Sequence, residues 1–379
     1  MTALAPALEL AQLLRPAGGG IHLVTTGRRE QLALQRALYR AGTDDEVQRR
    51  FEDNLGRLAR ARVVVLGVPS DVGAGFRRGA SLAPSALRTA LLAAQPDWPE
   101  WAEANGVLDV GDVRVIPQLL HDEMCSPAQI ARARHALYGD AASLLPVSPL
   151  SIEERALDLL LGLAPGAAPL VLGGDHSVAW PVTAAMQRAR PGFGIVQPDA
   201  HTDLLEERLG IRYCFATWSF HANDLVGRGG KLVQVGVRVS GRTREHWEST
   251  LGVRQFWSEG IVRDPAAALD AIIHAVRASG VRGVYLSNDV DGTDPRFAPA
   301  TGTPEAGGVE PSFLVALIER LGREVGLVAA DLVEVAPALG TADERRTTLD
   351  TSVTYLRATL DALLTERSLA LRGSAEHSG

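Results

Sequence analysis

Short runs of apolar, largely β-branched residues alternate along the chain with segments of helical periodicity, and this alternation constrains the fold most. Near-continuous apolar strands of this kind suit a parallel sheet that helices cover on both faces. The alternation therefore predicts the α/β class, with strands within residues 61–69, 168–175, 192–199, 231–238, 282–291 and 325–335.

Two helices between these strands carry end signals. Residues 151–163 begin with Ser151 and have Glu154 three residues later, which is a capping-box pattern, and residues 266–280 end at Gly280. The first residues, MTALAPALELAQLLRP, are expected to form a short amphipathic helix. One strand and one helix per unit is therefore the predicted rhythm.

The composition restricts the class of partner. The chain has 379 residues, 46% of them hydrophobic and 22% charged, as is usual for a globular protein. The net charge of -7, with Lys and Arg scattered, excludes an electrostatic footprint for nucleic acid or an anionic membrane. Cys125 and Cys214 show no zinc-finger or disulfide spacing, and neither a secretory leader nor a bilayer-spanning run is found. A small-molecule partner and a cytoplasmic location are expected.

Polar residues cluster where the apolar strands end. In open α/β sheets the usual ligand site is the crevice beyond the carboxyl ends of the strands. Within an extended strand, Asp199, His201 and Asp203 would project from one face because alternate side chains point the same way. Four polar segments lie at the ends of predicted strands: GGDHS (173–177), DAHTD (199–203), DVDGTD (289–294) and DLVE (331–334).

Each segment alone has a plainer interpretation. Asp175 or Ser177 could cap the next helix, DAHTD could be a solvated strand end, and DVDGTD resembles part of a calcium loop without its later positions. Their joint occurrence is different, because clustered carboxylates repel one another and raise their own pKa values. Together the four segments predict that cations neutralise this rim.

The charges indicate two ions. Four aspartates supply four negative charges, which two divalent cations would balance, and two neutral histidines complete the set: His176, Asp199, His201, Asp203, Asp289 and Asp291. Oxygen and imidazole ligands without thiolate favour Mn²⁺, with Co²⁺, Ni²⁺ and Zn²⁺ as alternatives. Paired ions lower the pKa of a shared water to about 7, which predicts a hydrolase.

The segments also resemble, in order, the signature blocks of the ureohydrolase family, which includes arginases, agmatinases and guanidinobutyrases. The resemblance spans residues 60–365 and adds GVPSDVGAGFRRGASLAPSALR (67–88) and the continuations of two motifs to residues 308 and 337. It implies a three-layer α/β/α sandwich with a mainly parallel eight-stranded sheet, two Mn²⁺ ions per chain, and hydrolysis of a guanidino group to urea and an amine. It further implies a trimer or hexamer.

Carried over by motif, the resemblance assigns the ligands of each ion. One ion takes His176, Asp199, Asp203 and Asp289, and the other takes Asp199, His201, Asp289 and Asp291. Asp203 also accepts a proton from the nucleophile, Glu334 faces the guanidinium as a paired carboxylate, and Thr303 lies near the same group. His221 is the nearest match to a loop histidine that protonates the leaving amine. The remaining histidines are expected to be structural or solvated.

The same resemblance divides the chain. Residues 1–60 are expected to be an N-terminal helical extension at the surface, residues 61–368 the ureohydrolase catalytic domain, and residues 369–379 a flexible tail.

Departures from the family pattern concern the substrate. His221 stands in the segment HAND, with Ala222 after it where glycine is common, and the stretch between Asp203 and His221 is long, so free arginine is disfavoured. Trp218 and Phe220 could flank the substrate's tail or anchor the loop, and Trp218 and Asn223 are predicted to influence substrate choice. Agmatine or guanidinobutyrate is the favoured substrate.

Several alternatives remain open. They are arginine, or free guanidine with nickel, as the substrate, a single-zinc deacetylase-like amidohydrolase, and an inactive relative. The deacetylase alternative is opposed by the absence of a His-His pair in the sequence. The inactive relative is opposed because no ligand position is missing.

Overall fold

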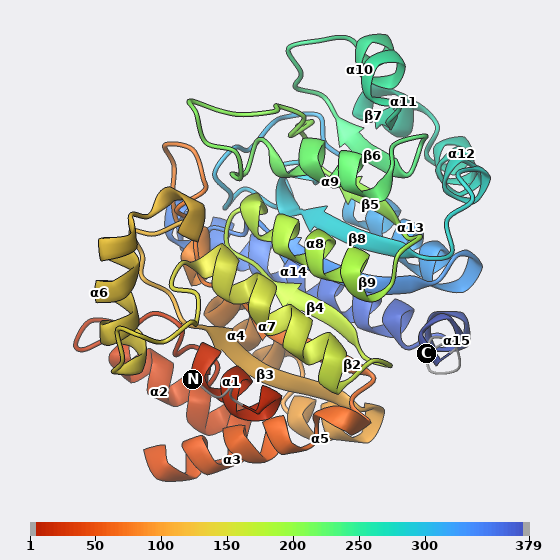
Figure 1. Cartoon of the computed structure of the whole chain (residues 1–379). Coiled ribbons are helices and arrows are strands. Elements are labelled where there is room, and N and C mark those ends of the chain that lie inside the picture. The colour runs from red at the N-terminus through yellow and green to blue at the C-terminus, as the bar shows by residue number, and fades with distance from the viewer. Residues whose placement is uncertain (1–4, 374–379) are drawn as a thin grey trace.

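A nine-stranded sheet forms the centre of the computed structural model, which describes residues 5–373 (Figure 1). The strand order is β1-β3-β2-β4-β9-β8-β5-β6-β7, and every neighbouring pair is parallel except β1 with β3. The strands are β1 Leu14–Arg15, β2 Val63–Gly67, β3 Val107–Val113, β4 Ala168–Leu172, β5 Gly194–Pro198, β6 Leu232–Val237, β7 Arg254–Trp257, β8 Val284–Asp289 and β9 Leu327–Val333.

Helices cover both faces of this sheet (Figure 1). One layer packs in the order α1, α7, α8, α9, and the other in the order α4, α14, α13, α12. Their bounds are α1 Pro6–Leu13, α7 Pro149–Leu163, α8 Ala179–Ala189, α9 Trp218–Val226, α4 Ala83–Ala94, α14 Ala342–Leu363, α13 Pro311–Glu324 and α12 Pro265–Ala278. The remaining helices are α2 Arg28–Tyr39, α3 Asp44–Gly56, α5 Trp98–Asn105, α6 Pro127–Tyr138, α10 Arg244–Leu251, α11 Ser258–Arg263 and α15 Glu366–Gly373. The predicted three-layer α/β/α class is therefore confirmed.

The six strands predicted from apolar runs are all present, and each is buried at every residue: β2, β4, β5, β6, β8 and β9. Two further parallel strands, β3 and β7, bring the parallel strands to the predicted eight, and β1 adds a ninth at the edge. Continuous burial on both faces explains why these runs lack polar alternation.

The first sixty residues are helical as predicted, but they are not only a surface extension. Leu10, Leu13 and Leu14 are at most 1% exposed and belong to the same hydrophobic core as the sheet. β1 pairs with β3, and α1 packs on α7. The apolar face of α1 thus requires a partner surface, and the main domain supplies it.

The predicted tail begins too early. Leu369 to Gly373 belong to α15, and the Arg372 side chain is fully buried, where it donates to the carbonyls of Leu327 and Leu363 at 3.0 and 2.9 Å. These bonds satisfy a buried guanidinium and hold the helix against β9. Residues 374–379 of the predicted tail lie outside the described residues.

Helix α7 begins two residues before the predicted start. Its N-cap is Ser148, and Pro149 is its first residue. Ser151 makes no capping box, because its hydroxyl accepts a hydrogen bond from the Asp122 N–H at 3.0 Å. Helix α12, Pro265–Ala278, begins one residue before the predicted start and ends two residues before Gly280. No helix within residues 5–373 combines the length and apolarity needed to cross a membrane.

One carboxyl group in α7 is buried without a partner. Glu153 is fully buried, and neither of its side-chain oxygens makes a hydrogen bond with the described residues. Burial first, and then the charge of Asp331, raise the pKa of Glu153 well above its ordinary value of 4.5. The folded protein therefore binds this proton more tightly than the unfolded chain does.

Replacing Glu153 should stabilise the protein at neutral pH. Above pH 4.5 the unfolded chain loses this proton first, so stability falls by about 1.4 kcal/mol per pH unit until the folded pKa is reached. Glu153→Met has no proton to lose and forfeits no hydrogen bond, so it should be about 1 to 3 kcal/mol more stable than the parent at pH 7.5, with the gain vanishing near pH 4. Urea unfolding at several pH values measures this. Glu154→Gln, at a half-buried position of the same helix where the carboxylate pairs with Arg188 at 2.8 Å, should show no gain at pH 7.5. A gain of Glu153→Met that is independent of pH would contradict the explanation.

Candidate metal centre

The four polar segments predicted from the sequence lie at the carboxyl ends of four adjacent strands. Segments 173–177 and 199–203 follow β4 and β5, whereas 289–294 and 331–334 begin within β8 and β9, and the order β4-β9-β8-β5 is consecutive in the sheet. Because these strands are parallel, their carboxyl ends meet at one edge, and the acids and histidines that follow them converge there.

The segment 199–203 converges by bending and not by strand alternation. β5 already ends at Pro198, and Asp203 has a left-handed backbone with φ of 51°. The Asp199 carboxylate accepts hydrogen bonds from the His201 N–H at 2.6 Å and from the Gln197 side-chain amide at 2.7 Å. The prediction that an extended strand aims these side chains is therefore wrong, although they do meet.

Around His176 lies a first cluster of ligand-type atoms. Its Nδ1 is 3.2 Å from Asp199 Oδ2, 3.2 Å from Asp203 Oδ2 and 3.1 Å from Asp289 Oδ2. Despite these distances, this buried Nδ1 makes no hydrogen bond with the described residues, whereas Nε2 lies 3.1 Å from Ser287 Oγ. A ring nitrogen that faces three carboxylate oxygens without bonding to them is in the position of a metal ligand.

A second cluster surrounds His201. Its Nδ1 lies 3.1 Å from Asp291 Oδ2 and 3.6 Å from Asp199 Oδ1. The two oxygens of Asp199 thus face different clusters, which suits a bridging carboxylate. Backbone and side-chain donors fix the acids, since Asp291 accepts from the Ala200 N–H at 3.1 Å and from Thr303 Oγ1 at 2.9 Å. The atoms of each group, His176–Asp199–Asp289 and Asp199–His201–Asp291, lie within 4.8 Å of one another.

The electrostatics of the clusters call for cations. Burial and the neighbouring Asp291 and Asp199 raise the pKa of Asp289 well above its ordinary value. For Asp203, burial and the charge of Asp199 raise the pKa to about 6. Burial alone would lower the pKa of His201, but Asp291 and Asp199 outweigh it and raise this pKa to about 12. The clustered carboxylates therefore disfavour one another's charge, and divalent ions, which the donor set of imidazole and carboxylate suits, would relieve this repulsion.

Glu334 stands over the first cluster. It follows β9 with a left-handed φ of 61°, is 7% exposed, and its Oε1 accepts the His176 N–H at 3.0 Å. The other oxygen, Oε2, makes no hydrogen bond with the described residues, and it faces Gly302, where an added Cβ would lie 3.7 Å from it. Burial first, and then Asp175, raise the pKa of Glu334 well above its ordinary value. A cationic substrate group would relieve this penalty.

His221 is not brought to the clusters. Its Nε2 lies 2.9 Å from the Glu206 carbonyl oxygen, and its ring packs edge-on against Tyr213 and Trp180 at 5.2 and 5.9 Å between centroids. Burial lowers the pKa of His221 below its ordinary value. In this arrangement it supports the loop after Asp203.

The expectation for Trp218 and Asn223 is also corrected. Trp218 is fully buried, its Nε1–H donates to Asp203 Oδ2 at 3.1 Å, and its ring centroid lies 4.6 Å from that of His176. Asn223 is buried and donates to the Leu251 carbonyl at 2.9 Å. Neither side chain is available to a substrate tail, and Phe220 packs on His221.

Supporting residues around the clusters carried no signal in the sequence. Ser287 lies between His176 and Asp331, and its hydroxyl is 3.1 and 3.0 Å from the two Asp331 oxygens. Tyr285 also donates to Asp331. A serine and a tyrosine within an apolar strand are too common to mark such a role, although DLVE did mark Asp331.

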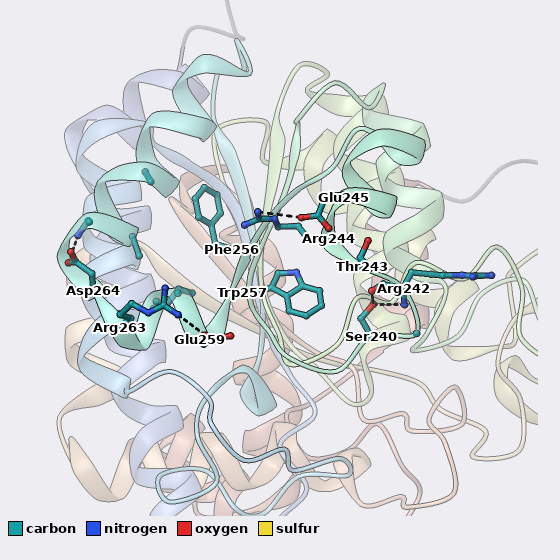
Figure 2. A pocket seen from close by; sticks show the side chains of 16 residues that line it. Ser240, Arg242, Thr243, Arg244, Glu245, Phe256, Trp257, Glu259, Arg263 and Asp264 are labelled. Atoms are coloured by element: carbon teal, nitrogen blue, oxygen red, sulfur yellow. Dashed lines mark hydrogen bonds and ion pairs between the residues drawn. The ribbon is translucent and has the colours of Figure 1, made fainter.

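A large cavity lies elsewhere. About 890 Å³ opens between α10, β7, α11 and α12, where Figure 2 shows Phe256 and Trp257 beside Arg244, and Arg263 paired with Glu259. None of the predicted site residues lines it. The chemistry of the clusters, and not cavity size, therefore identifies the candidate site.

Comparisons with known proteins identify the family of the chain. A family model described as the arginase family matches residues 61–359. The N(1)-aminopropylagmatine ureohydrolase of Thermus thermophilus is 34% identical over 277 residues, covering 73% of this chain and 83% of the relative. The guanidinobutyrase of Pseudomonas aeruginosa is 30% identical over 289 residues, covering 73% and 79%.

A solved structure agrees. That of the agmatine ureohydrolase of Thermoplasma volcanium aligns with a TM-score of 0.61 and 26% identity, over 84% of this chain and 93% of that one. The matched residues 61–359 contain both clusters and Glu334.

Proposed function

Because the chain belongs to the arginase family, we propose that it is a binuclear-metal hydrolase that releases urea from a small guanidino compound. The observation that carries the proposal is the pair of clusters that share Asp199, with the open carboxylate of Glu334 beside them. The proposed ligands are His176, Asp199, Asp203 and Asp289 for one ion and Asp199, His201, Asp289 and Asp291 for the other.

In the proposed reaction, the ions supply Lewis-acid activation of water at neutral pH. Glu334 orients the planar guanidinium through its open oxygen, while the His176 N–H holds the other oxygen. Asp203 takes up the proton that the attacking water releases and returns it to the nitrogen of the leaving amine. The C–N bond then breaks to give urea and the amine. We assign no proton transfer to His221, because its ring nitrogen is bonded to the Glu206 carbonyl.

The proposed substrates are agmatine-like or guanidinobutyrate-like compounds. The named activities of the relatives support this choice, since they include an N(1)-aminopropylagmatine ureohydrolase, a guanidinobutyrase and agmatinases. Arginine and free guanidine are the competing substrates.

A urea-release assay tests the proposed function. Purified protein loaded with Mn²⁺ or Ni²⁺ is offered agmatine, N(1)-aminopropylagmatine, 4-guanidinobutyrate, arginine and guanidine. Turnover of one of the first three with two ions per chain is expected, and chelation should abolish it. Unchanged urea release after chelation, or no urea from any of the five compounds, would refute the proposal.

Three finer points belong to the same proposal. We infer Mn²⁺ as the native ion, which the imidazole and carboxylate ligands support. The free state of Cys125 and Cys214 supports a cytoplasmic location. A trimer or hexamer follows from the family resemblance, and light scattering on the purified protein would test it.

A further inference from the structure

Arg238, in the loop after β6, makes an unusual number of contacts. Its guanidinium donates six hydrogen bonds, all to backbone carbonyls: Nε to Glu305 at 3.1 Å, Nη1 to Gly236 and Gly292 at 3.0 and 3.2 Å, and Nη2 to Asp291, Glu305 and Thr293 at 2.6, 2.7 and 3.4 Å. Its own backbone N–H donates to Ala200 at 3.0 Å. The side chain therefore joins the turn 291–293 and the loop of Glu305 to the end of β6, and the backbone of Arg238 joins a third segment at Ala200.

These three segments surround the second cluster. Ala200 lies between Asp199 and His201, and the turn 291–293 begins with Asp291. The loop that contains Glu305 also carries Thr303, whose hydroxyl donates to Asp291 Oδ2 at 2.9 Å. The Glu305 carboxylate lies 3.9 Å from His201 Nε2. By contrast, none of the five accepting carbonyls belongs to His176, Asp203 or Glu334.

The geometry requires a guanidinium. Arginine presents five N–H donors in a rigid planar fork, whereas lysine presents three donors on a flexible stem. A lysine at this position could reach some of the carbonyls but could not hold Gly236, Asp291 and Glu305 in one plane.

We propose that Arg238 is a positioning residue for the second ion: it fixes Asp291 and the loop of Thr303 and Glu305 relative to His201. The inference rests on the proposed binuclear function. The guanidinium of Arg238 bonds only backbone carbonyls among the described residues, so its effect passes through the turn and loop that it holds.

The test is a calorimetric titration of the metal-depleted protein with Mn²⁺. The parent should show two binding steps, and Asp291→Asn identifies the step that belongs to the second cluster. Arg238→Lys should weaken that same step by about 10- to 100-fold and leave the other step within about twofold of the parent. Arg238→Gln is measured in parallel, so that the result does not depend on one variant folding.

Arg372→Lys is the matched control. Arg372 is also a buried arginine that donates to backbone carbonyls, but it lies beside the start of β9, at the opposite end of the strands from the clusters. It should lower the melting temperature without changing either binding step. Equal weakening of both steps in Arg238→Lys and Arg238→Gln, or no weakening in either, would overturn the role of Arg238. A parent that binds fewer than two ions would instead overturn the proposed function.

Discussion

Asp291→Asn is expected to lose more than about 100-fold in urea release and to retain one ion per chain. The amide removes one negative charge and one oxygen ligand from the second cluster, where Asp291 faces His201 at 3.1 Å. The first cluster keeps His176, Asp203 and Asp289, so that its ion should stay. The carboxylate follows a strand end and packs little apolar surface, and the fold should persist.

Metal analysis, circular dichroism and the urea assay together measure this outcome. Asp270→Asn is the control, because Asp270 is exposed and pairs only with Arg320 at the surface. If Asp291→Asn binds two ions and releases urea at the parent's rate, Asp291 is not a ligand of the second ion.

Glu334→Gln should separate substrate binding from metal binding. Both ions should remain, since Glu334 contacts the clusters only through the His176 N–H, which an amide oxygen can still accept. The loss of a charge-assisted pair in a buried pocket is worth about 1.5 to 3 kcal/mol, or about 10- to 150-fold in kcat/KM. Glutamine also replaces a titratable carboxyl group by an amide that does not titrate, so the pH profile of the remaining activity should change.

Steady-state kinetics and metal content check this prediction. Glu310→Gln is a suitable control, because Glu310 is exposed and occupies the N-cap position of α13 without a side-chain capping hydrogen bond. Loss of an ion from Glu334→Gln would show that the carboxylate serves the metal centre, and kinetics equal to the parent's would show that it does not face the substrate.

The strands that the sequence could predict are those made of continuous apolar residues. β2, β4, β5, β6, β8 and β9 are buried runs of apolar residues. β3 escaped notice because it contains Asp109 and Asp112, yet both acids pair with Arg88 of α4, which is only 2% exposed. That pairing depends on tertiary structure. The edge strand β7 is four residues long, and β1 is two, so neither leaves a pattern.

The residues of the candidate site also differ in whether the sequence could predict their roles. The acids and histidines of the clusters could be predicted because strand ends converge and like charges cannot gather without cations. Trp218 and Arg238 could not, because their roles follow from contacts with residues far along the chain. His221 was chosen for its position in the sequence, and packing around Tyr213 and Trp180 directs its ring elsewhere.

The left-handed backbones of Asp203 and Glu334 bear on any effort to make this protein more heat-resistant. A non-glycine residue in that conformation destabilises the fold by about 1 to 3 kcal/mol, and both residues stand at the catalytic rim. Glycine or asparagine would adopt the same backbone with less strain. A selection for thermal stability alone would therefore favour such replacements at these two positions. The selected variants would be more stable but would have little turnover.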